Sequence, residues 1–328
     1  MAKPEIKSDT FGVPYSPLSL PGEIPLEPDN IMEPLLTRSR ERAGELSIIL
    51  PAKNEAEGLR MVLPALVKGF PDAEIIVVND GSSDDTAVMC QEHRVKLVNR
   101  PYAMGNGAAI KAGAREATGN ILVFMDADGQ HKPEDIPKLL RKLDDGFDMV
   151  VGARDGNSQA SLGRWFANFG YNRFASLIVG RRIDDLTSGF RAAKANKFRE
   201  FLHLLPNGFS YPTTSTMAFF RSGYPVAYVP IQTKKRRGKS HIKWARDGLR
   251  FLVIVFKVGT LYAPLKIFLP FSGLSFMAGL ANYAYTYFTE GRFTNMSAVL
   301  FIVAILIFLM GLLSEQITML LFQKTDRR

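Results

Sequence analysis

Residues 120–128 read NILVFMDAD, a run of branched and aromatic apolar side chains that ends in two aspartates. Four further runs have the same character, and the stretches between them show the apolar period of helices. These runs are ELSIILPA (45–52), AEIIVVND (73–80), VKLVN (95–99) and FDMVVGAR (147–154). Strands that alternate with helices predict a parallel, doubly wound α/β sheet. The unbroken hydrophobicity of IIVV and ILVF predicts strands that are covered on both faces.

Polar side chains follow these strands at their carboxyl ends. Open parallel sheets bind their ligands beyond this edge, so the polar side chains there are candidates for a site. They are Asn54, Glu55, Asp80, Asp126, Asp128 and Arg154.

Composition limits the class of protein. The chain has 328 residues, and its hydrophobic fraction of 46% is enough for one sizeable α/β domain with an appendage. A single cysteine, Cys90, excludes an intramolecular disulfide framework and is expected to be a small buried apolar residue. The net charge of +9 points to an anionic partner, either nucleic acid, a phosphorylated substrate or an acidic membrane.

The N-terminal segment, residues 1–44, is polar and rich in proline, and we expect a flexible leader there. It contains no apolar stretch of the kind found in signal peptides, so we expect the domain at 45–233 to stay in the cytosol.

Two long apolar stretches, 263–288 and 297–322, close the sequence. Each is long enough to cross about 30 Å of hydrocarbon at a helical rise of about 1.5 Å per residue. The connection between them carries one arginine, whereas Lys324, Arg327 and Arg328 follow the second stretch, so both outer flanks are expected to be cytoplasmic, with a short tail at 323–328. Two buried helices of a soluble protein are the alternative interpretation.

A basic segment precedes the first apolar stretch. The run KKRRGKS (234–240) is followed, up to residue 262, by alternating basic and apolar residues at helical spacing, which predicts a helix in the membrane interface. The alternative is a helix that continues directly into the membrane, and Pro264 argues for a break instead.

The motif FMDADGQH (124–131) is the sharpest chemical signal in the sequence. A turn after the strand can bring Asp126 and Asp128 toward one divalent cation and a diphosphate, and their oxygen ligands favour Mg²⁺ or Mn²⁺ over zinc. Such a pair of aspartates also occurs in turns and helix caps. In VVNDGSSDDT (77–86), Asp80 is assigned to a nucleotide base, whereas Asp84 and Asp85 suit the start of a helix.

The motifs PAKNEAEGL (51–59), VVNDGSSDDT and FMDADGQH, in this order, resemble those of the family 2 glycosyltransferases of the GT-A fold. Together with two C-terminal spans, they resemble the polyprenyl-phosphate sugar transferases in particular. The resemblance implies inverting transfer of a sugar from a UDP- or GDP-sugar to a polyprenyl phosphate, with Mg²⁺ or Mn²⁺, and association of copies through the membrane helices.

The resemblance also implies roles for individual residues. It places Pro51, Ala52, Asn54, Glu55, Asp80 and Asp126 around the nucleotide, and Asp126, Asp128 and Gln130 around the metal. The glycine-rich segment GNGAAIKAG (105–113) brings Lys111 near the donor, although Lys111 also fits a solvated helical lysine. In VGARD (151–155), DLTSGFRA (185–192) and the basic run, the resemblance assigns Arg154, Ser188, Arg191, Arg236 and Lys239 to the acceptor phosphate. The basic run fits a solvated or lipid-attracted run of charges equally well. Asp128, Arg154 and Ser188 are the expected catalytic residues.

The sequence departs from the family pattern in its second half. Where many relatives carry a carboxylate, this chain has Gly189 and the hydroxyl run 213–216, so no general base is evident. A phosphate monoester, with a second pKa of about 6, needs no such base, and this favours a lipid-phosphate acceptor. Glu315, inside the second apolar stretch, is expected to reach the interface or to contact another subunit.

Four other functions fit less well. A processive polysaccharide synthase would show a late acidic motif and a Gln-x-x-Arg-Trp signature, and neither is present. An inactive lipid-binding scaffold does not explain Asp126, Asp128 and Gln130. A dinucleotide-binding dehydrogenase is disfavoured because GNGAAI lacks the third glycine and follows the wrong strand. The positive net charge favours nucleic-acid binding, but the sequence shows no motif of a nucleic-acid-binding fold.

Overall fold

The structure is a computed structural model that describes residues 45–154, 162–208, 210–233, 256–257 and 259–323. The leader at 1–44, the run 234–240 with Arg236 and Lys239, most of the predicted interfacial helix and the last five residues lie outside the described residues.

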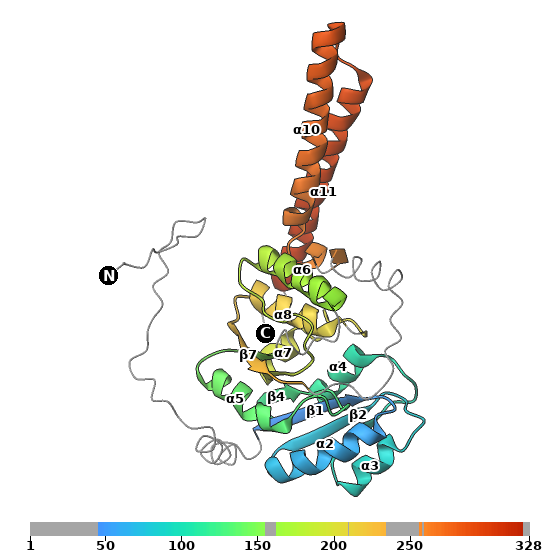
Figure 1. The fold of residues 1–328 in the computed structure, drawn as a ribbon, viewed down its shortest axis with the longest axis vertical. Helices are drawn as coiled ribbons and strands as arrows, with labels where there is room; N and C mark the ends of the chain where they lie inside the picture. The colour runs from blue at the N-terminus through green and yellow to red at the C-terminus, as the bar shows by residue number, and fades with distance from the viewer. Residues whose placement is uncertain (1–44, 155–161, 209, 234–255, 258, 324–328) are drawn as a thin grey trace, which may run out of the picture.

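A seven-stranded sheet forms the centre of the domain, in the order β3-β2-β1-β4-β6-β5-β7 (Figure 1). The five strands predicted from sequence are confirmed, and they pair in parallel wherever two of them are neighbours. Their bounds, with those of two further strands, are Leu46–Ala52 (β1), Glu74–Asn79 (β2), Lys96–Asn99 (β3), Ile121–Phe124 (β4), Met149–Arg154 (β5), Arg191–Lys194 (β6) and Val226–Ile231 (β7).

Strand β6 is antiparallel to both of its neighbours, β4 and β5. It therefore begins at the edge where β4 and β5 end, and the segment that leads into it, 185–190, lies at that edge. The sheet is mixed but mostly parallel, as predicted. The sequence did not indicate β6, because RAAK is short and carries charged residues at both ends.

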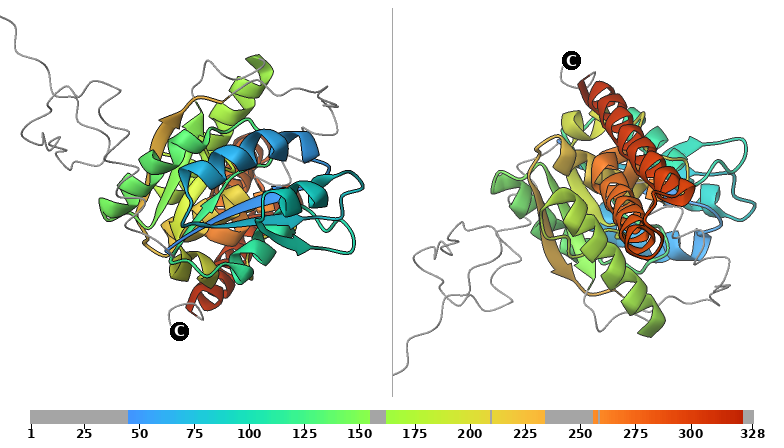
Figure 2. Two further views of the ribbon diagram at one scale, coloured as in Figure 1. Left: turned by 90° about the horizontal axis from the view of Figure 1, so that it is seen from below. Right: turned by 90° about the horizontal axis from the view of Figure 1, so that it is seen from above.

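Helices cover both faces of the sheet, as the buried strands require (Figure 2). One core contains side chains of α2, α3 and α5, and the other contains side chains of α4, α6, α7 and α8. Cys90 is buried in the first core as predicted, and burial raises the pKa of its thiol to about 11. The helices are Ala56–Gly69 (α2), Thr86–Glu92 (α3), Asn106–Glu116 (α4), Ile136–Asp144 (α5), Leu162–Val179 (α6), Ala195–Glu200 (α7) and Tyr211–Arg221 (α8), with a short 3-10 helix at Pro133–Asp135 (η2).

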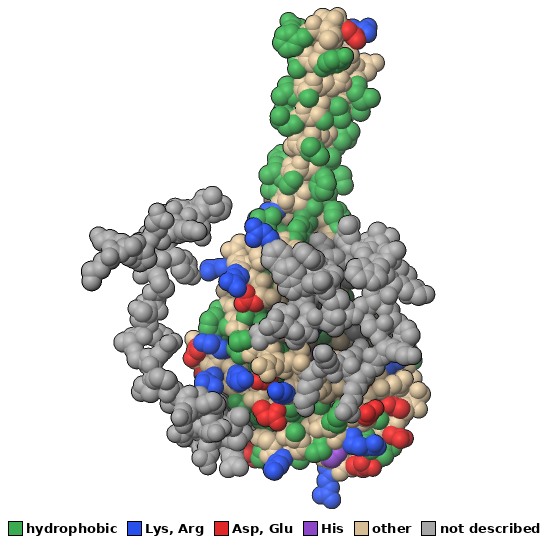
Figure 3. All heavy atoms as spheres, in the orientation of Figure 1, with side chains coloured by type: hydrophobic (Ala, Val, Ile, Leu, Met, Phe, Trp, Pro, Cys, Tyr) green, Lys and Arg blue, Asp and Glu red, His purple; other side chains and the backbone are tan. Residues whose placement is uncertain are grey.

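The C-terminal helices α10 (Pro264–Glu290) and α11 (Asn295–Gln323) form a hairpin that projects from the domain (Figure 1). Both are long and apolar enough to cross a membrane by length and composition. Apolar side chains are spread along the projecting hairpin, which carries charged side chains at its tip, and charged side chains are scattered over the visible face of the domain (Figure 3). Only 22% of the residues in the most apolar part of α10 are buried, and 17% of those in the most apolar part of α11. The two helices therefore do not belong to the core of the domain.

The base of the hairpin is built onto the domain through α8. Residues 259–262 are helical, and Ala263 leaves the helical conformation (φ −155°, ψ 66°) just ahead of Pro264, where the break was predicted. The buried Tyr262 hydroxyl donates a hydrogen bond to the Thr214 carbonyl of α8 at 2.7 Å. Glu315 was expected to reach the interface or another subunit. Instead it pairs with Arg221 of the same chain, because the last turn of α8 lies beside α11.

Candidate active site

A pocket of about 690 Å³ lies at the carboxyl edge of the sheet. Its walls come from both halves of the domain, with the ends of β1, β2 and β4 on one side and the segments around Thr187 and Tyr211 on the other. The residues predicted from sequence that line it are Pro51, Ala52, Glu55, Asp80, Asp126, Asp128 and Gln130.

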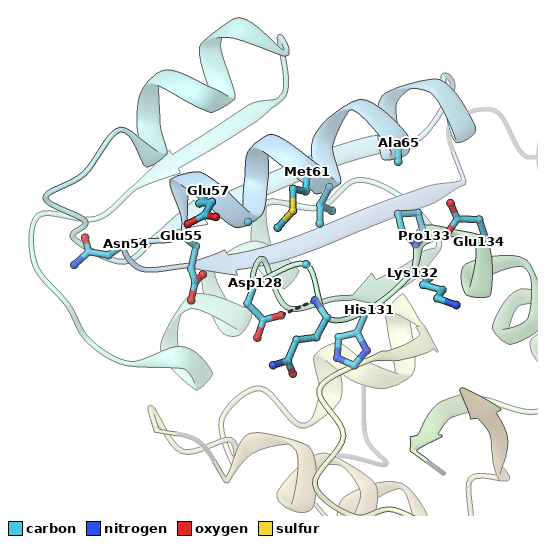
Figure 4. Close-up of a pocket in the computed structure, with 14 residues that line it drawn as sticks. Asn54, Glu55, Glu57, Met61, Ala65, Asp128, His131, Lys132, Pro133 and Glu134 are labelled. Carbon is cyan, nitrogen blue, oxygen red and sulfur yellow. Dashed lines mark hydrogen bonds between the residues drawn. The ribbon is translucent and has the colours of Figure 1, made fainter. Parts of the chain in front are cut away.

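The turn after β4 brings Asp126 and Asp128 to this one pocket. Strand β4 ends at Phe124, and the backbone reverses at Gly129, whose φ is 74°. The Gln130 amide then donates a hydrogen bond to Asp128 Oδ1 at 3.1 Å, which closes the turn (Figure 4). A turn therefore follows β4 as predicted, and both aspartates line the same pocket.

A second pocket of about 500 Å³ adjoins the first and shares Glu55, Asp128 and Gln130 with it. It lies between α2 and the segment 128–134, and Figure 4 shows the residues that each of these two walls contributes. Asn54 lines this second pocket and not the first.

Asp126, Asp128 and Gln130 fit a Mg²⁺ or Mn²⁺ ion by the chemistry of their oxygen atoms. Among the described residues, no group of three or more His, Cys, Asp or Glu side chains forms a metal site. Two carboxylates and one amide leave coordination positions for water and for phosphate oxygens of a substrate. Mg²⁺ is commonly bound in this way.

Asp80 lines the pocket, but its carboxylate is already used by the protein. Its two oxygens accept hydrogen bonds from the amides of Met104 and Gly105, at 2.9 Å and 2.8 Å. Arg100 lies 3.5 Å away, and Asp80 is 4% exposed. The carboxylate therefore shapes the loop that enters α4.

Asn54 and Asp84 connect the loops after β1 and β2. Asn54 adopts a left-handed backbone (φ 56°), and its Oδ1 accepts a hydrogen bond from the Ser83 amide at 2.8 Å. Asp84 accepts hydrogen bonds from the amides of Ala56 and Thr86, so one carboxylate serves the starts of α2 and α3, as the capping interpretation predicted. Burial raises the pKa of Asp84, and hydrogen bonds from Thr86 and Ala56 outweigh it, so this pKa lies below its ordinary value.

The Lys111 side chain forms hydrogen bonds within the domain and does not line the pocket. Its ammonium donates hydrogen bonds to the Leu205 carbonyl (3.0 Å) and to Asn207 Oδ1 (2.6 Å). The Gly107 and Ala108 amides at the start of α4 bind the carbonyls of Gly208 and Asn207. The glycine-rich segment thus holds residues 205–208 in place, just before α8.

Arg154 and Asp185 form a two-point ion pair beside the pocket. Arg154 donates from Nε and Nη2 to the two oxygens of Asp185, at 2.8 Å and 3.1 Å, and from Nη2 to Thr187 Oγ1 at 2.6 Å. Burial raises the pKa of Asp185, and the Arg154 guanidinium outweighs it and holds the pKa below its usual range. The pair fixes the start of the segment 185–190, and the Arg154 side chain remains 32% exposed.

Ser188 and Arg191 lie beneath the pocket and not on its wall. Arg191 is fully buried, and its guanidinium donates to the Pro212 carbonyl (2.9 Å), to the Ser215 hydroxyl (2.7 Å) and to the Ser188 carbonyl. The Ser188 hydroxyl is buried and has no hydrogen-bond partner in the part of the chain that the structure describes. As the site is built here, Arg191 supports the pocket and does not reach an acceptor.

Several residues that line the pocket were not singled out from the sequence. Tyr211 and Pro212, at the start of α8, complete the wall together with Thr187, and Asn106 adds the start of α4. Thr187 and Asn106 lie within the motifs DLTSGFRA and GNGAAIKAG, whereas no motif pointed to Tyr211 and Pro212. Asp185 lay within a quoted motif, but only its pairing with Arg154 shows its importance.

Comparison with known proteins identifies related domains. Residues 47–202 match the model of the glycosyl transferase family 2, and residues 263–320 match that of the GtrB C-terminal hairpin. Polyprenol monophosphomannose synthase of Mycolicibacterium smegmatis is 30% identical over 238 residues, which cover 67% of this chain and 86% of that protein.

Other similarities cover less of the chain or are more distant. Undecaprenyl-phosphate 4-deoxy-4-formamido-L-arabinose transferase of Proteus mirabilis is 35% identical over 164 residues, which are 46% of this chain and 49% of that protein. Glucosyl-3-phosphoglycerate synthase of Mycobacterium tuberculosis, solved with Mn²⁺, UDP and phosphoglyceric acid, superposes with a TM-score of 0.54. The identity in that superposition is 22%, over 70% of this chain and 82% of the other, so it shows the fold alone.

Proposed function

The chain belongs to glycosyltransferase family 2, and from this we propose that it transfers a sugar from a nucleotide sugar to a polyprenyl phosphate held in a membrane. One observation carries the proposal: the pocket that holds Asp126 and Asp128 belongs to a domain whose helix α8 is fixed to the apolar hairpin. A soluble acceptor would not require that attachment, whereas a lipid acceptor must be met at a membrane. A processive polysaccharide synthase or an inactive scaffold finds no comparable support.

The donor occupies the half of the pocket formed by β1, β2 and β4. Pro51, Ala52, Glu55 and Asp80 surround the nucleoside, and Asp126 lies by the ribose and diphosphate. Asp126, Asp128 and Gln130 would hold Mg²⁺ or Mn²⁺. When bound, the ion would stabilise the negative charge of the departing nucleoside diphosphate.

The acceptor phosphate enters from the half formed by 187–189 and α8. An oxygen of the lipid phosphate attacks the anomeric carbon while the bond to the diphosphate breaks, and one such displacement inverts the configuration. Thr187, Gly189, Tyr211 and Pro212 line this half, and none of these four is a carboxylate or a histidine that could serve as a base. A phosphate nucleophile, already ionised at neutral pH, needs none.

Basic residues are proposed to hold that phosphate. Arg154 presents a planar guanidinium that suits phosphate oxygens, and Ser188 lies in the adjoining segment. Arg236 and Lys239 of the basic run are expected to contribute as well. Arg191 is assigned the supporting role described above, because its guanidinium is buried and already bonded.

The membrane orientation is part of the proposal. The domain at 45–233 and both flanks of the hairpin are placed in the cytoplasm, because basic residues gather at these flanks. The segment 234–262 would lie at the membrane surface, and the hairpin helices provide a surface through which copies could associate.

The direct test incubates the purified full-length protein with Mg²⁺ or Mn²⁺, a short polyprenyl phosphate, and labelled UDP- and GDP-sugars in parallel. We expect label from one donor to enter the organic phase and to be lost with EDTA. The matched control replaces polyprenyl phosphate by the free polyprenol, which should accept nothing. Release of nucleotide without lipid-linked label would move the proposal to another acceptor, and inactivity across a broad donor panel would favour the scaffold.

A further inference from the structure

The carboxylate of Asp126 lies between two groups to which no role has been given so far. Gly189 approaches it through its backbone, and His131 approaches through its ring. The Asp126 side chain is still 37% exposed, so the remaining face is open to a ligand.

Gly189 makes room for Asp126 by having no side chain. A Cβ atom at this position would lie 2.9 Å from Oδ2 and 3.2 Å from Oδ1 of Asp126, closer than such atoms normally approach. The φ of Gly189 is outside the left-handed region, so its backbone would accept alanine. A Cβ at 189 would therefore displace the Asp126 carboxylate from its present position, whereas the backbone conformation of Gly189 would not be strained.

His131 also approaches Oδ2 of the same carboxylate. Its Nε2 lies 3.6 Å from Asp126 Oδ2, a distance typical of an electrostatic contact and longer than a hydrogen bond. The ring is 7% exposed and stacks on Phe190, with centroids 5.1 Å apart and planes at 15°. His131 is thus fixed by the residue next to Gly189, and the two contacts to Asp126 share one backbone support.

We propose that Gly189 and His131 are positioning residues for Asp126, which together set the direction of its carboxylate toward a divalent cation and diphosphate. This inference rests on the proposed function of Asp126. It assigns two separate tasks: the missing side chain at 189 leaves space for the Asp126 carboxylate in its present position, and the His131 ring contacts that carboxylate from 3.6 Å away. Partners of this kind around metal ligands commonly change metal affinity by about 10- to 100-fold.

The test measures Mn²⁺ binding by electron paramagnetic resonance on the full-length protein, in the presence of UDP or GDP, for wild type and variants. Gly189→Ala should weaken Mn²⁺ binding by about 10- to 100-fold, and His131→Phe, which keeps the stack on Phe190, by about 10-fold. Gly69→Ala is the matched control. It also adds one Cβ at a glycine without a left-handed φ, no atom lies within 4 Å of that Cβ, and wild-type binding is expected.

The possible results separate this inference from the function on which it rests. Wild-type Mn²⁺ affinity in Gly189→Ala and His131→Phe, with loss in Asp128→Asn, would overturn the positioning role alone. No bound Mn²⁺ in the wild type would remove the proposed metal site and this inference with it. Thermal unfolding reports whether each variant folds, and if Gly189→Ala does not fold, His131→Phe decides the matter.

Discussion

Arg221, the last residue of α8, lies 2.7 Å through its Nη2 from Oε1 of Glu315 in α11. The other oxygen of Glu315 accepts a hydrogen bond from the Leu265 amide at the start of α10, at 3.4 Å. One carboxylate therefore joins the domain to both helices of the hairpin. The side chains of Arg221 and Glu315 are only 30% and 16% exposed, so solvent screens this pair less than a surface pair.

Breaking this pair should loosen the hairpin from the domain. We expect Arg221→Ala and Glu315→Ala each to lower the free energy of unfolding by about 1–3 kcal/mol, since a partly buried charge then loses its partner. The double variant should cost less than the sum of the two, because both substitutions remove the same contact. Denaturant unfolding in detergent measures all three, and strictly additive losses would show that the pair is not coupled.

The Arg154–Asp185 pair predicts a specific dependence of stability on pH. The pKa of Asp185 is lower in the folded protein than in the unfolded chain. Its contribution is therefore complete above the unfolded value of about 3.9 and disappears as the pH falls through the folded value. The difference in thermal stability between wild type and Asp185→Asn should be full at neutral pH and shrink below about pH 4. A difference that stays constant down to pH 3 would contradict the ionic role of Asp185.

We predict that Lys111 stabilises residues 205–208, the segment before α8, and does not bind the charged donor. Lys111→Met removes two hydrogen bonds from a charged donor, which corresponds to a loss of about 1.5–3 kcal/mol. Hydrogen exchange of the amides around 205–208 should accelerate in this variant. The control is Lys142→Met, whose ion pair with Asp145 is about half exposed on both sides and should cost about 0.5 kcal/mol or less.

Two helical glycines should respond in opposite directions to the same substitution. Gly→Ala inside a helix ordinarily stabilises by about 0.5–1 kcal/mol. At Gly107, however, the new Cβ would lie 2.1 Å from the Pro206 carbonyl oxygen, so α4 and the segment 205–208 must separate. Gly107→Ala should therefore lower the melting temperature, and Gly69→Ala, with open space, should keep or raise it. Equal shifts in both variants would show that the approach at Gly107 is not tight.

The proposed role of Asp128 in binding the metal gives the simplest functional prediction. Asp128→Asn keeps the size of the side chain but removes the negative charge, so metal-dependent transfer should be lost while circular dichroism and melting temperature stay near wild type. Full activity in this folded variant would exclude Asp128 from the metal site.

The sequence predicted the parts of the fold that depend on local pattern. Unbroken apolar runs identified five strands, and the aspartates after β4 could be placed at one edge because parallel strands end together. The features that the sequence could not predict depend on contacts between segments that are far apart along the chain. Strand β6 is recognisable only by its pairing with β4 and β5, and Arg191 is buried because Pro212 and Ser215, far along the chain, accept its hydrogen bonds.

Helix α8 lines the pocket at its start, through Tyr211 and Pro212, and contacts the residues at the base of the hairpin through both Thr214 and Arg221. Its eleven residues from Tyr211 to Arg221, at about 1.5 Å each, separate the two ends by roughly 15 Å. Because Tyr262 and Glu315 fix α8 to the hairpin, the domain cannot settle freely onto a bilayer and bring the pocket down to it. The pocket therefore keeps its place relative to the hairpin, and a lipid acceptor would have to bring its phosphate to that place.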